Sequence, residues 1–118
     1  MNVSDPLIRA SVTFLGPGEG GRLSPVRAGY MPHLVVGDPA KRVADLAEDG
    51  RTLTESYLGV RVRGHDKTPL SLCQAHALDL ELIYAPEVDY SALQSGASFT
   101  VREGHIVVGY GQVLEGVK

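Results

Sequence analysis

Short stretches of alternating apolar and polar residues are the main pattern in this chain. Residues 8–15 place every second side chain in one apolar set, which consists of Ile8, Ala10, Val12 and Phe14. A period of two is typical of a strand that is buried on one face. Less regular versions of this pattern occupy residues 31–36, 53–63, 78–84, 98–102 and 106–114. The sequence therefore predicts about six β-strands.

Glycine and proline separate these stretches. Residues 16–21 contain four glycines and Pro17, so the chain must turn there. Glu103 and Gly104 lie between the last two stretches, where they predict a tight hairpin turn. Closing a sheet removes its exposed edges, which favours a closed arrangement for a small all-β chain. We therefore expect one all-β domain over residues 1–118, a small antiparallel six-stranded barrel.

One segment departs from the strand pattern. Asp38 is a suitable helix N-cap, and Pro39 suits the first helical position. Gly50 can end a helix in the left-handed conformation. Between them, a helical spacing relates Ala40, Val43, Leu46 and Ala47. The sequence predicts a short inserted helix within residues 38–50.

Composition and charge narrow the function classes. The chain has 118 residues, of which 43% are hydrophobic and 21% are charged, as expected for one folded domain. A net charge of −3 provides no general attraction to nucleic acid or to an anionic membrane. Residues 1–6 lack the features of a signal peptide, and no stretch approaches the ~18 apolar residues of a membrane span. These features predict a cytoplasmic protein without membrane contact, and Cys73, the single cysteine, is expected in the core.

Residues that could carry chemistry are scattered. The four histidines, at positions 33, 65, 76 and 105, form no metal-binding spacing, so we expect no metal and no cofactor. Gly16, Gly18 and Gly21 match the spacing of a dinucleotide fingerprint, but Pro25 interrupts the helix that this motif requires. No GTP-binding loop is present either. Cys73 and His76 are three residues apart, which alone does not define a nucleophile and its base. The sequence predicts no catalytic residue and no enzyme activity.

Carboxylates are densest between residues 79 and 89. A glycosidase or a cation site would need them to converge in a cleft, whereas the alternation places Asp79 and Glu81 on an outer strand face. If residues 58–63 pair antiparallel with 78–84, Arg61 and Arg63 lie opposite these carboxylates. Such pairing would neutralise the most basic strand and leave it poorly placed to bind phosphates.

Two motifs resemble a known family. The first is Glu19-Gly20-Gly21-Arg22-Leu23-Ser24-Pro25, continuing to Gly29-Tyr30-Met31-Pro32, and the second is Arg102-Glu103-Gly104, continuing to Val108-Gly109-Tyr110-Gly111-Gln112-Val113. Together they resemble the C-terminal β-barrel domain of elongation factor Tu, over residues 8–36 and 78–114. The resemblance implies a six-stranded antiparallel barrel of that type, here without its GTPase. It also implies an association with translation, because the family barrel helps to hold the T stem of aminoacyl-tRNA and touches the nucleotide-exchange factor.

The resemblance carries over some tRNA-contacting positions and not others. Arg22 is retained, His33 stands where the family has glutamine, and Glu103 and Gly104 match the second motif. Met31 replaces an arginine of the first motif, while a glycine and an arginine of the second are replaced by His105 and Ile106. Fewer cations weaken the electrostatic attraction to phosphates. Exposed Met31 and Ile106 would instead suit a protein partner.

Two functions remain open from the sequence. The first is a noncatalytic module that binds tRNA or another structured RNA through Arg22, His33 and the loop at Glu103 and Gly104. The alternative is a protein-interaction module, a mimic, competitor or inhibitor of a translation-related protein, that uses Met31 and Ile106. A structural reading competes with both, in which the motif glycines serve only backbone geometry and close strand packing.

Overall fold

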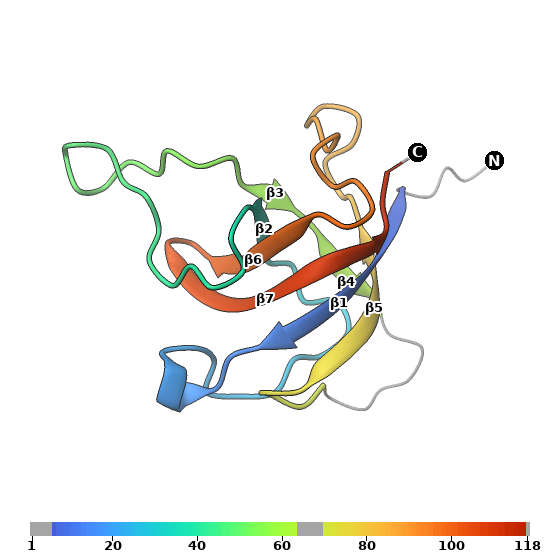
Figure 1. Cartoon of the computed structure of the whole chain (residues 1–118), viewed down its shortest axis with the longest axis horizontal. Helices are drawn as coiled ribbons and strands as arrows, with labels where there is room; N and C mark the ends of the chain where they lie inside the picture. Colours follow the sequence, from blue (N-terminus) through green and yellow to red (C-terminus); the bar gives the residue numbers. More distant parts are fainter. Residues whose placement is uncertain (1–5, 64–69, 118) are drawn as a thin grey trace.

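Seven strands and one short 3₁₀ helix make up the regular structure of the described residues. The computed structural model describes residues 6–63 and 70–117 (Figure 1), so the expectations for residues 1–5 and for His65 lie outside the described residues. In chain order the elements are β1 (Leu7–Phe14), η1 (Pro17–Glu19), β2 (His33–Val36), β3 (Leu58–Gly59), β4 (Arg61–Arg63), β5 (Ala75–Glu81), β6 (Ser98–Glu103) and β7 (Ile106–Glu115).

The strands form one antiparallel sheet that curls into a half-barrel (Figure 1). Their order is β3-β2-β6-β7-β1-β5-β4. The two edge strands, β3 and β4, are consecutive in the chain and separated only by Val60. Val60 and Val62 donate backbone hydrogen bonds to the carbonyls of Pro32 and Tyr30, at 3.0 and 2.8 Å. Residues 58–63 therefore join the two edges, with residues 30–34 on one side and β5 on the other.

The prediction of six strands is not confirmed, because the stretch at residues 53–63 contributes two strands. Leu58–Gly59 pairs with β2, and Arg61–Arg63 pairs with β5. A Cβ at position 59 would lie 2.2 Å from the ring of Tyr84, so glycine leaves room for that ring where the segment changes partner. The all-β antiparallel class is confirmed.

The inward faces of the strands form one apolar core. Alternation in β1 buries Ile8, Ala10, Val12 and Phe14, as the sequence predicts. A Cβ at Gly111 would lie 2.1 Å from the carbonyl oxygen of Ser11, so glycine allows β7 to approach β1 closely. The remaining core comes from the other strands and the loops, chiefly Val26, Leu34, Val60, Val62, Leu80, Leu82, Leu93, Phe99 and Val101.

The prediction of a helix within residues 38–50 is wrong. Residues 38–57 form an extended excursion, called here the arm, which projects from the sheet (Figure 1). Isolated bridges join Val43 to Ile106 of β7 and Leu46 to Leu53 within the arm. A short helix exposed to water is marginal by itself, whereas the extended arm gives its backbone amides partners. For example, the amide of Ala47 donates to the carbonyl of Thr52 at 2.8 Å.

The outer face of β4 and β5 carries the predicted ion pairs. Arg61 lies opposite Glu81, and Arg63 lies opposite Asp79. Arg61 and Arg63 reach the carboxylate of Glu81 at 3.3 and 3.6 Å. The predicted pairing is therefore confirmed for residues 61–63, while residues 58–59 pair with β2 instead.

Cys73 is exposed, so the expectation of a core cysteine is wrong. The backbone of Cys73 has a φ of 62°, and its amide donates to the carbonyl of Phe14. This conformation turns the thiol outward beside Glu19.

Within residues 6–63 and 70–117, no helix has the length and apolar character needed to cross a membrane.

Candidate functional site

The two motif loops meet in a cluster of Arg22, Tyr30 and Glu103, called here the motif cluster. One carboxylate oxygen of Glu103 accepts hydrogen bonds from both the Arg22 guanidinium and the Tyr30 hydroxyl. The guanidinium also lies over the Tyr30 ring, 4.5 Å from its centroid. Arg22 and Glu103, two of the predicted site residues, are thus brought together and bound to each other.

The motif cluster rests on the core. The Tyr30 ring packs edge-on against Phe14, with 6.1 Å between centroids. Burial, and then the hydrogen bond to Glu103, raises the pKa of Tyr30 above its usual range. Only 19% of the Arg22 side chain is exposed, against 41% for Glu103. These contacts give Arg22 a structural role in joining two loops. The carboxylate of Glu103 pairs with the positive charge of Arg22.

The motif glycines have structural roles as well. A Cβ at Gly21 would lie 2.2 Å from the carbonyl oxygen of Leu15, so no other residue fits beside that strand end. Gly104 turns the β6–β7 hairpin with a φ of 59°. Both positions agree with the structural reading of the motifs.

A second cluster, which sequence reasoning missed, surrounds Arg102 and is called here the arm anchor. The side chain of Arg102 is fully buried. Its guanidinium donates to both oxygens of Glu55, at 2.9 and 3.1 Å, and to the Tyr57 hydroxyl at 2.9 Å. Its Nε donates to the Thr100 hydroxyl at 2.9 Å. Arg102 thereby ties the arm to the outer face of β6.

The arm anchor extends along the arm. Lys41 contacts Asp45 at 2.6 Å and Glu55 at 3.4 Å, and the amide of Asp45 donates to Glu55 at 2.8 Å. The hydrogen bond from Arg102 lowers the pKa of Glu55 to about 2. Glu55 is therefore ionised at neutral pH and holds two cations. Arg102 is part of the second sequence motif, but nothing in the sequence links it to a glutamate in the arm.

The remaining predicted site residues lie apart from the motif cluster. His33 on β2 packs against the Tyr57 ring, with 6.0 Å between centroids. Met31 is exposed and lies beside Arg61, with 3.8 Å between its sulfur and a guanidinium nitrogen. Ile106 is exposed and pairs with Val43 of the arm. Gly104 is at the hairpin tip, next to Glu103.

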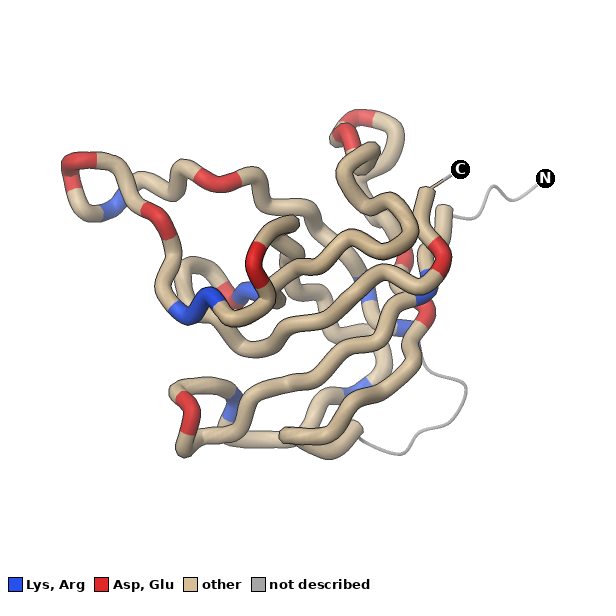
Figure 2. Tube along the Cα trace, in the orientation of Figure 1, with Lys and Arg blue, Asp and Glu red and all other residues tan. Residues whose placement is uncertain are grey.

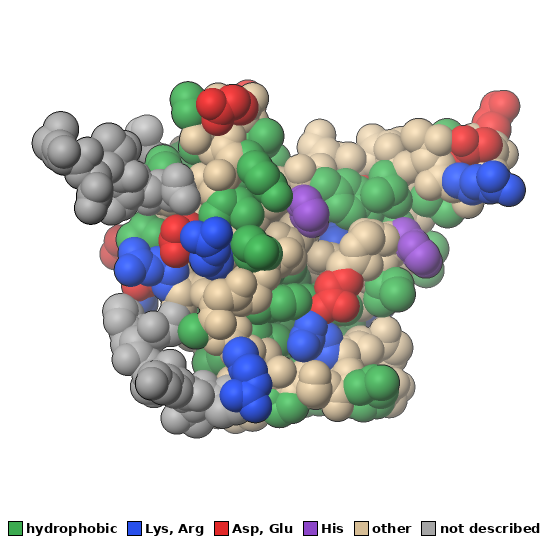
Figure 3. Space-filling view, turned by 180° about the vertical axis from the view of Figure 1, so that it is seen from behind, with side chains coloured by type: hydrophobic (Ala, Val, Ile, Leu, Met, Phe, Trp, Pro, Cys, Tyr) green, Lys and Arg blue, Asp and Glu red, His purple; other side chains and the backbone are tan. Residues whose placement is uncertain are grey.

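Apolar side chains gather where the arm meets the β6–β7 hairpin. We call the exposed residues Val43, Leu46, Leu53 and Ile106 the arm patch. Two depressions of about 430 and 290 Å³ lie there, and both are lined by Leu46 and His105. Figure 3 shows hydrophobic side chains over the projecting arm and over the body of the protein on the face seen from behind.

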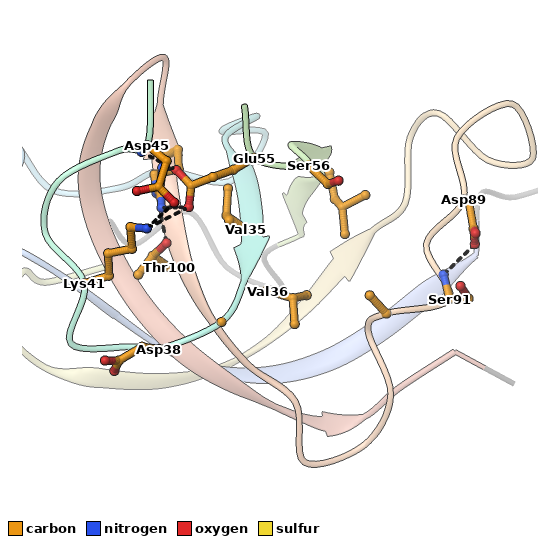
Figure 4. Close-up of a pocket in the computed structure, with 14 residues that line it drawn as sticks. Val35, Val36, Asp38, Lys41, Asp45, Glu55, Ser56, Asp89, Ser91 and Thr100 are labelled. Atoms are coloured by element: carbon orange, nitrogen blue, oxygen red, sulfur yellow. Dashed lines mark hydrogen bonds and ion pairs between the residues drawn. The ribbon is translucent and has the colours of Figure 1, made fainter. Parts of the chain in front are cut away.

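A larger groove of about 770 Å³ lies between the arm and the loop of residues 82–97 (Figure 4). Val35, Val36, Leu58 and Ala92 supply its apolar lining. Asp38 and Asp89 lie on opposite sides of the groove, with Val36 between them (Figure 4). The arm anchor contributes the remaining charged lining, namely Lys41, Asp45, Glu55 and Arg102.

Cations are dispersed and mostly paired with carboxylates. Figure 2 shows Lys and Arg spread over separate elements instead of gathered on one. Ion pairs engage Arg9, Arg22, Lys41, Arg61, Arg63 and Arg102. Within the part of the chain that the structure describes, no three His, Cys, Asp or Glu residues group so that they could hold a metal ion.

No protein-family model matches the chain, and no curated protein matches it.

Proposed function

We propose that this chain is a noncatalytic module that binds a protein partner through the arm patch. The observation that carries the proposal is the apolar surface where the arm meets the β6–β7 hairpin. Val43 is 76% exposed and Ile106 is 47% exposed, although the two residues are adjacent through a backbone bridge. Neighbouring exposed apolar residues with depressions between them are typical of a protein docking surface.

The alternative function, binding of tRNA or another structured RNA, has less support. It requires Arg22 to contact phosphate, yet Glu103 and Tyr30 occupy its guanidinium. The nearby position 106 carries an exposed isoleucine instead of a cation. Phosphate contacts dominate nonspecific affinity for nucleic acid, so paired arginines contribute little. We also propose that the chain is related to elongation factor Tu and that it acts in the cytoplasm.

Affinity capture with a matched variant tests the protein partner. The tagged chain is incubated with nuclease-treated lysate, beside the double variant Val43→Ser/Ile106→Ser. A control variant, Leu23→Ser/Leu114→Ser, removes two exposed apolar side chains outside the arm patch. The proposal expects one or more proteins that the parent and the control capture and the arm-patch variant does not. Circular dichroism confirms that each variant is folded.

A direct RNA measurement separates the two functions. Filter binding with total tRNA at low and moderate salt should show no binding that depends on Arg22. Salt-sensitive tRNA binding that Arg22→Ala weakens would favour the RNA module. Equal capture of the same proteins by the parent and by the arm-patch variant would overturn the proposed protein-binding surface.

A further inference from the structure

The groove of about 770 Å³ has two walls, and side-chain hydrogen bonds hold each of them in place. One wall is the arm, which Arg102 holds in place through Glu55. The other is the loop of residues 82–97, whose Tyr90 donates a hydrogen bond to the carbonyl of Gly59 at 2.5 Å. The groove uses none of the four arm-patch residues. Its volume falls in the range that holds a small ligand or a few side chains.

The charges of the groove disfavour an anionic occupant. Arg102 is fully buried, and its nitrogens donate to Glu55, Tyr57 and Thr100. The ammonium group of Lys41 contacts Asp45 and Glu55. Both cations of the lining are therefore already engaged by protein groups. The lining also contains four carboxylates, those of Asp38, Asp45, Glu55 and Asp89.

Asp38 and Asp89 are two exposed carboxylates of the lining, separate from those that Lys41 and Arg102 contact. Each side chain is held by a backbone amide, from Ala40 at 2.9 Å and from Ser91 at 2.8 Å. The hydrogen bonds from Ser91 lower the pKa of Asp89, so its carboxylate is ionised at neutral pH. Val36 lies between these two carboxylates, and Val35 lines the groove beside Glu55 and Thr100 (Figure 4).

An apolar lining flanked by negative charge matches one kind of side chain. Lysine and arginine combine an aliphatic stem with a cationic end, and they bury the stem against apolar surface while the charged end stays in water or meets an anion. A fully apolar segment would gain no attraction from the two carboxylates, and an acidic one would be repelled.

We propose that this groove binds a basic segment of a protein partner, in which a Lys or Arg stem packs on Val35 and Val36 and its cation reaches Asp38 or Asp89. Apolar side chains of the partner, next to that Lys or Arg in its sequence, would fill the remaining apolar space over Leu58 and Ala92. Arg102 acts here as a positioning residue, because it holds the arm that forms one wall.

Nuclear magnetic resonance with a defined probe tests this proposal. The ¹⁵N-labelled full chain is titrated with an acetylated heptapeptide of alternating Leu and Arg. Saturable shifts are expected at the amides of Val35, Val36 and Ser91. A peptide with Glu in place of Arg should bind at least tenfold more weakly, since it exchanges attraction for repulsion.

Variants then locate the charge effect. Asp38→Asn/Asp89→Asn keeps an oxygen that can accept from the amides of Ala40 and Ser91, and it should weaken binding of the Leu–Arg peptide by about tenfold. The control Glu48→Gln/Glu115→Gln removes the same charge outside the groove and should change binding by less than about twofold.

Several results would overturn the proposal. They are equal binding of the acidic peptide, unchanged affinity in the Asp38→Asn/Asp89→Asn variant, or shifts confined to amides elsewhere. Absence of saturable shifts at millimolar peptide would also overturn it. The variant Val43→Ser/Ile106→Ser should bind the peptide as the parent does. The peptide titration therefore tests the groove independently of the arm patch.

Discussion

Two clusters with the same side chains, the motif cluster and the arm anchor, occupy neighbouring positions of β6. Each contains an arginine, a glutamate and a tyrosine, and in each the guanidinium lies over the tyrosine ring, at 4.5 Å in the motif cluster and 5.5 Å in the arm anchor. Glu103 of the first cluster follows directly after Arg102 of the second. They differ in depth, because Arg22 is partly exposed whereas Arg102 is fully buried.

The difference in burial determines how much each ion pair contributes to stability. An ion pair near water contributes up to about 1 kcal/mol, because solvent and salt screen it. Leaving one member of a buried pair without its partner costs about 3–5 kcal/mol. The motif cluster, which the sequence brings to attention, therefore joins two loops with modest energy. The arm anchor, which the sequence does not reveal, determines where the arm lies.

The largest effect is expected for Glu55→Gln. The change leaves the buried guanidinium of Arg102 without a counter-charge, so the free energy of unfolding at pH 7 should fall by about 3 kcal/mol. Urea denaturation followed by circular dichroism measures this change. Glu48→Gln, an exposed carboxylate in the same arm, serves as the control and should be within about 0.5 kcal/mol of the parent. Equal effects of the two variants would remove the distinction between buried and exposed charge.

The pH dependence of the same variant adds a second measurement. The folded pKa of Glu55, about 2, lies below its ordinary value of 4.5. The carboxylate therefore stabilises the folded state above about pH 4.5, and this contribution is lost as the pH falls towards 2. The difference between the parent and Glu55→Gln should narrow over that range. Asp49, whose pKa is also lowered to about 2, titrates in both proteins and does not affect the difference.

A smaller effect is expected for Arg102→Met. Glu55 retains Lys41 and the amide of Asp45, and its side chain is 12% exposed, so it can be hydrated. We expect a loss of about 2 kcal/mol in the free energy of unfolding. The double variant Arg102→Met/Glu55→Leu replaces the pair by apolar side chains and should recover most of this loss. A double variant less stable than Arg102→Met would contradict this account of the arm anchor.

The smallest effect is expected for Arg22→Ala in the motif cluster. Glu103 is 41% exposed and can be hydrated after the arginine is removed. The free energy of unfolding should fall by no more than about 1 kcal/mol, and by less at high salt, because the pair is screened. Urea denaturation at low and high salt measures both values. A loss as large as that of Glu55→Gln would show that exposure does not separate the two clusters.

Local pattern was sufficient for most of the sheet. Alternation over residues 8–15 predicts β1 and its buried face, and the glycine at position 104 predicts the β6–β7 turn. The pairing of Arg61 and Arg63 with Asp79 and Glu81 also followed from alternation and charge. These features depend on side-chain period and turn geometry, which act between near neighbours in sequence or between facing strands.

The candidate site was predicted only in part. The motifs brought forward Arg22 and Glu103, but not their bond to each other, because they are 81 residues apart. A protein-binding surface at Met31 and Ile106 required both side chains to be exposed, and both are exposed. Val43, the bridge partner of Ile106, was assigned to a helix instead.

By itself, the sequence determined the all-β class, the positions of the main strands and the glycine-dependent turns, because these follow from local geometry. Tertiary structure decided the course of the arm and the burial of Arg102. Residues 38–50 satisfy the local rules for a helix, yet the carboxylate of Glu55 binds Arg102 across 47 residues, and Val43 of the extended arm bridges Ile106 of β7. An arginine becomes fully buried only when a distant partner supplies its counter-charge, and one sequence does not identify that partner.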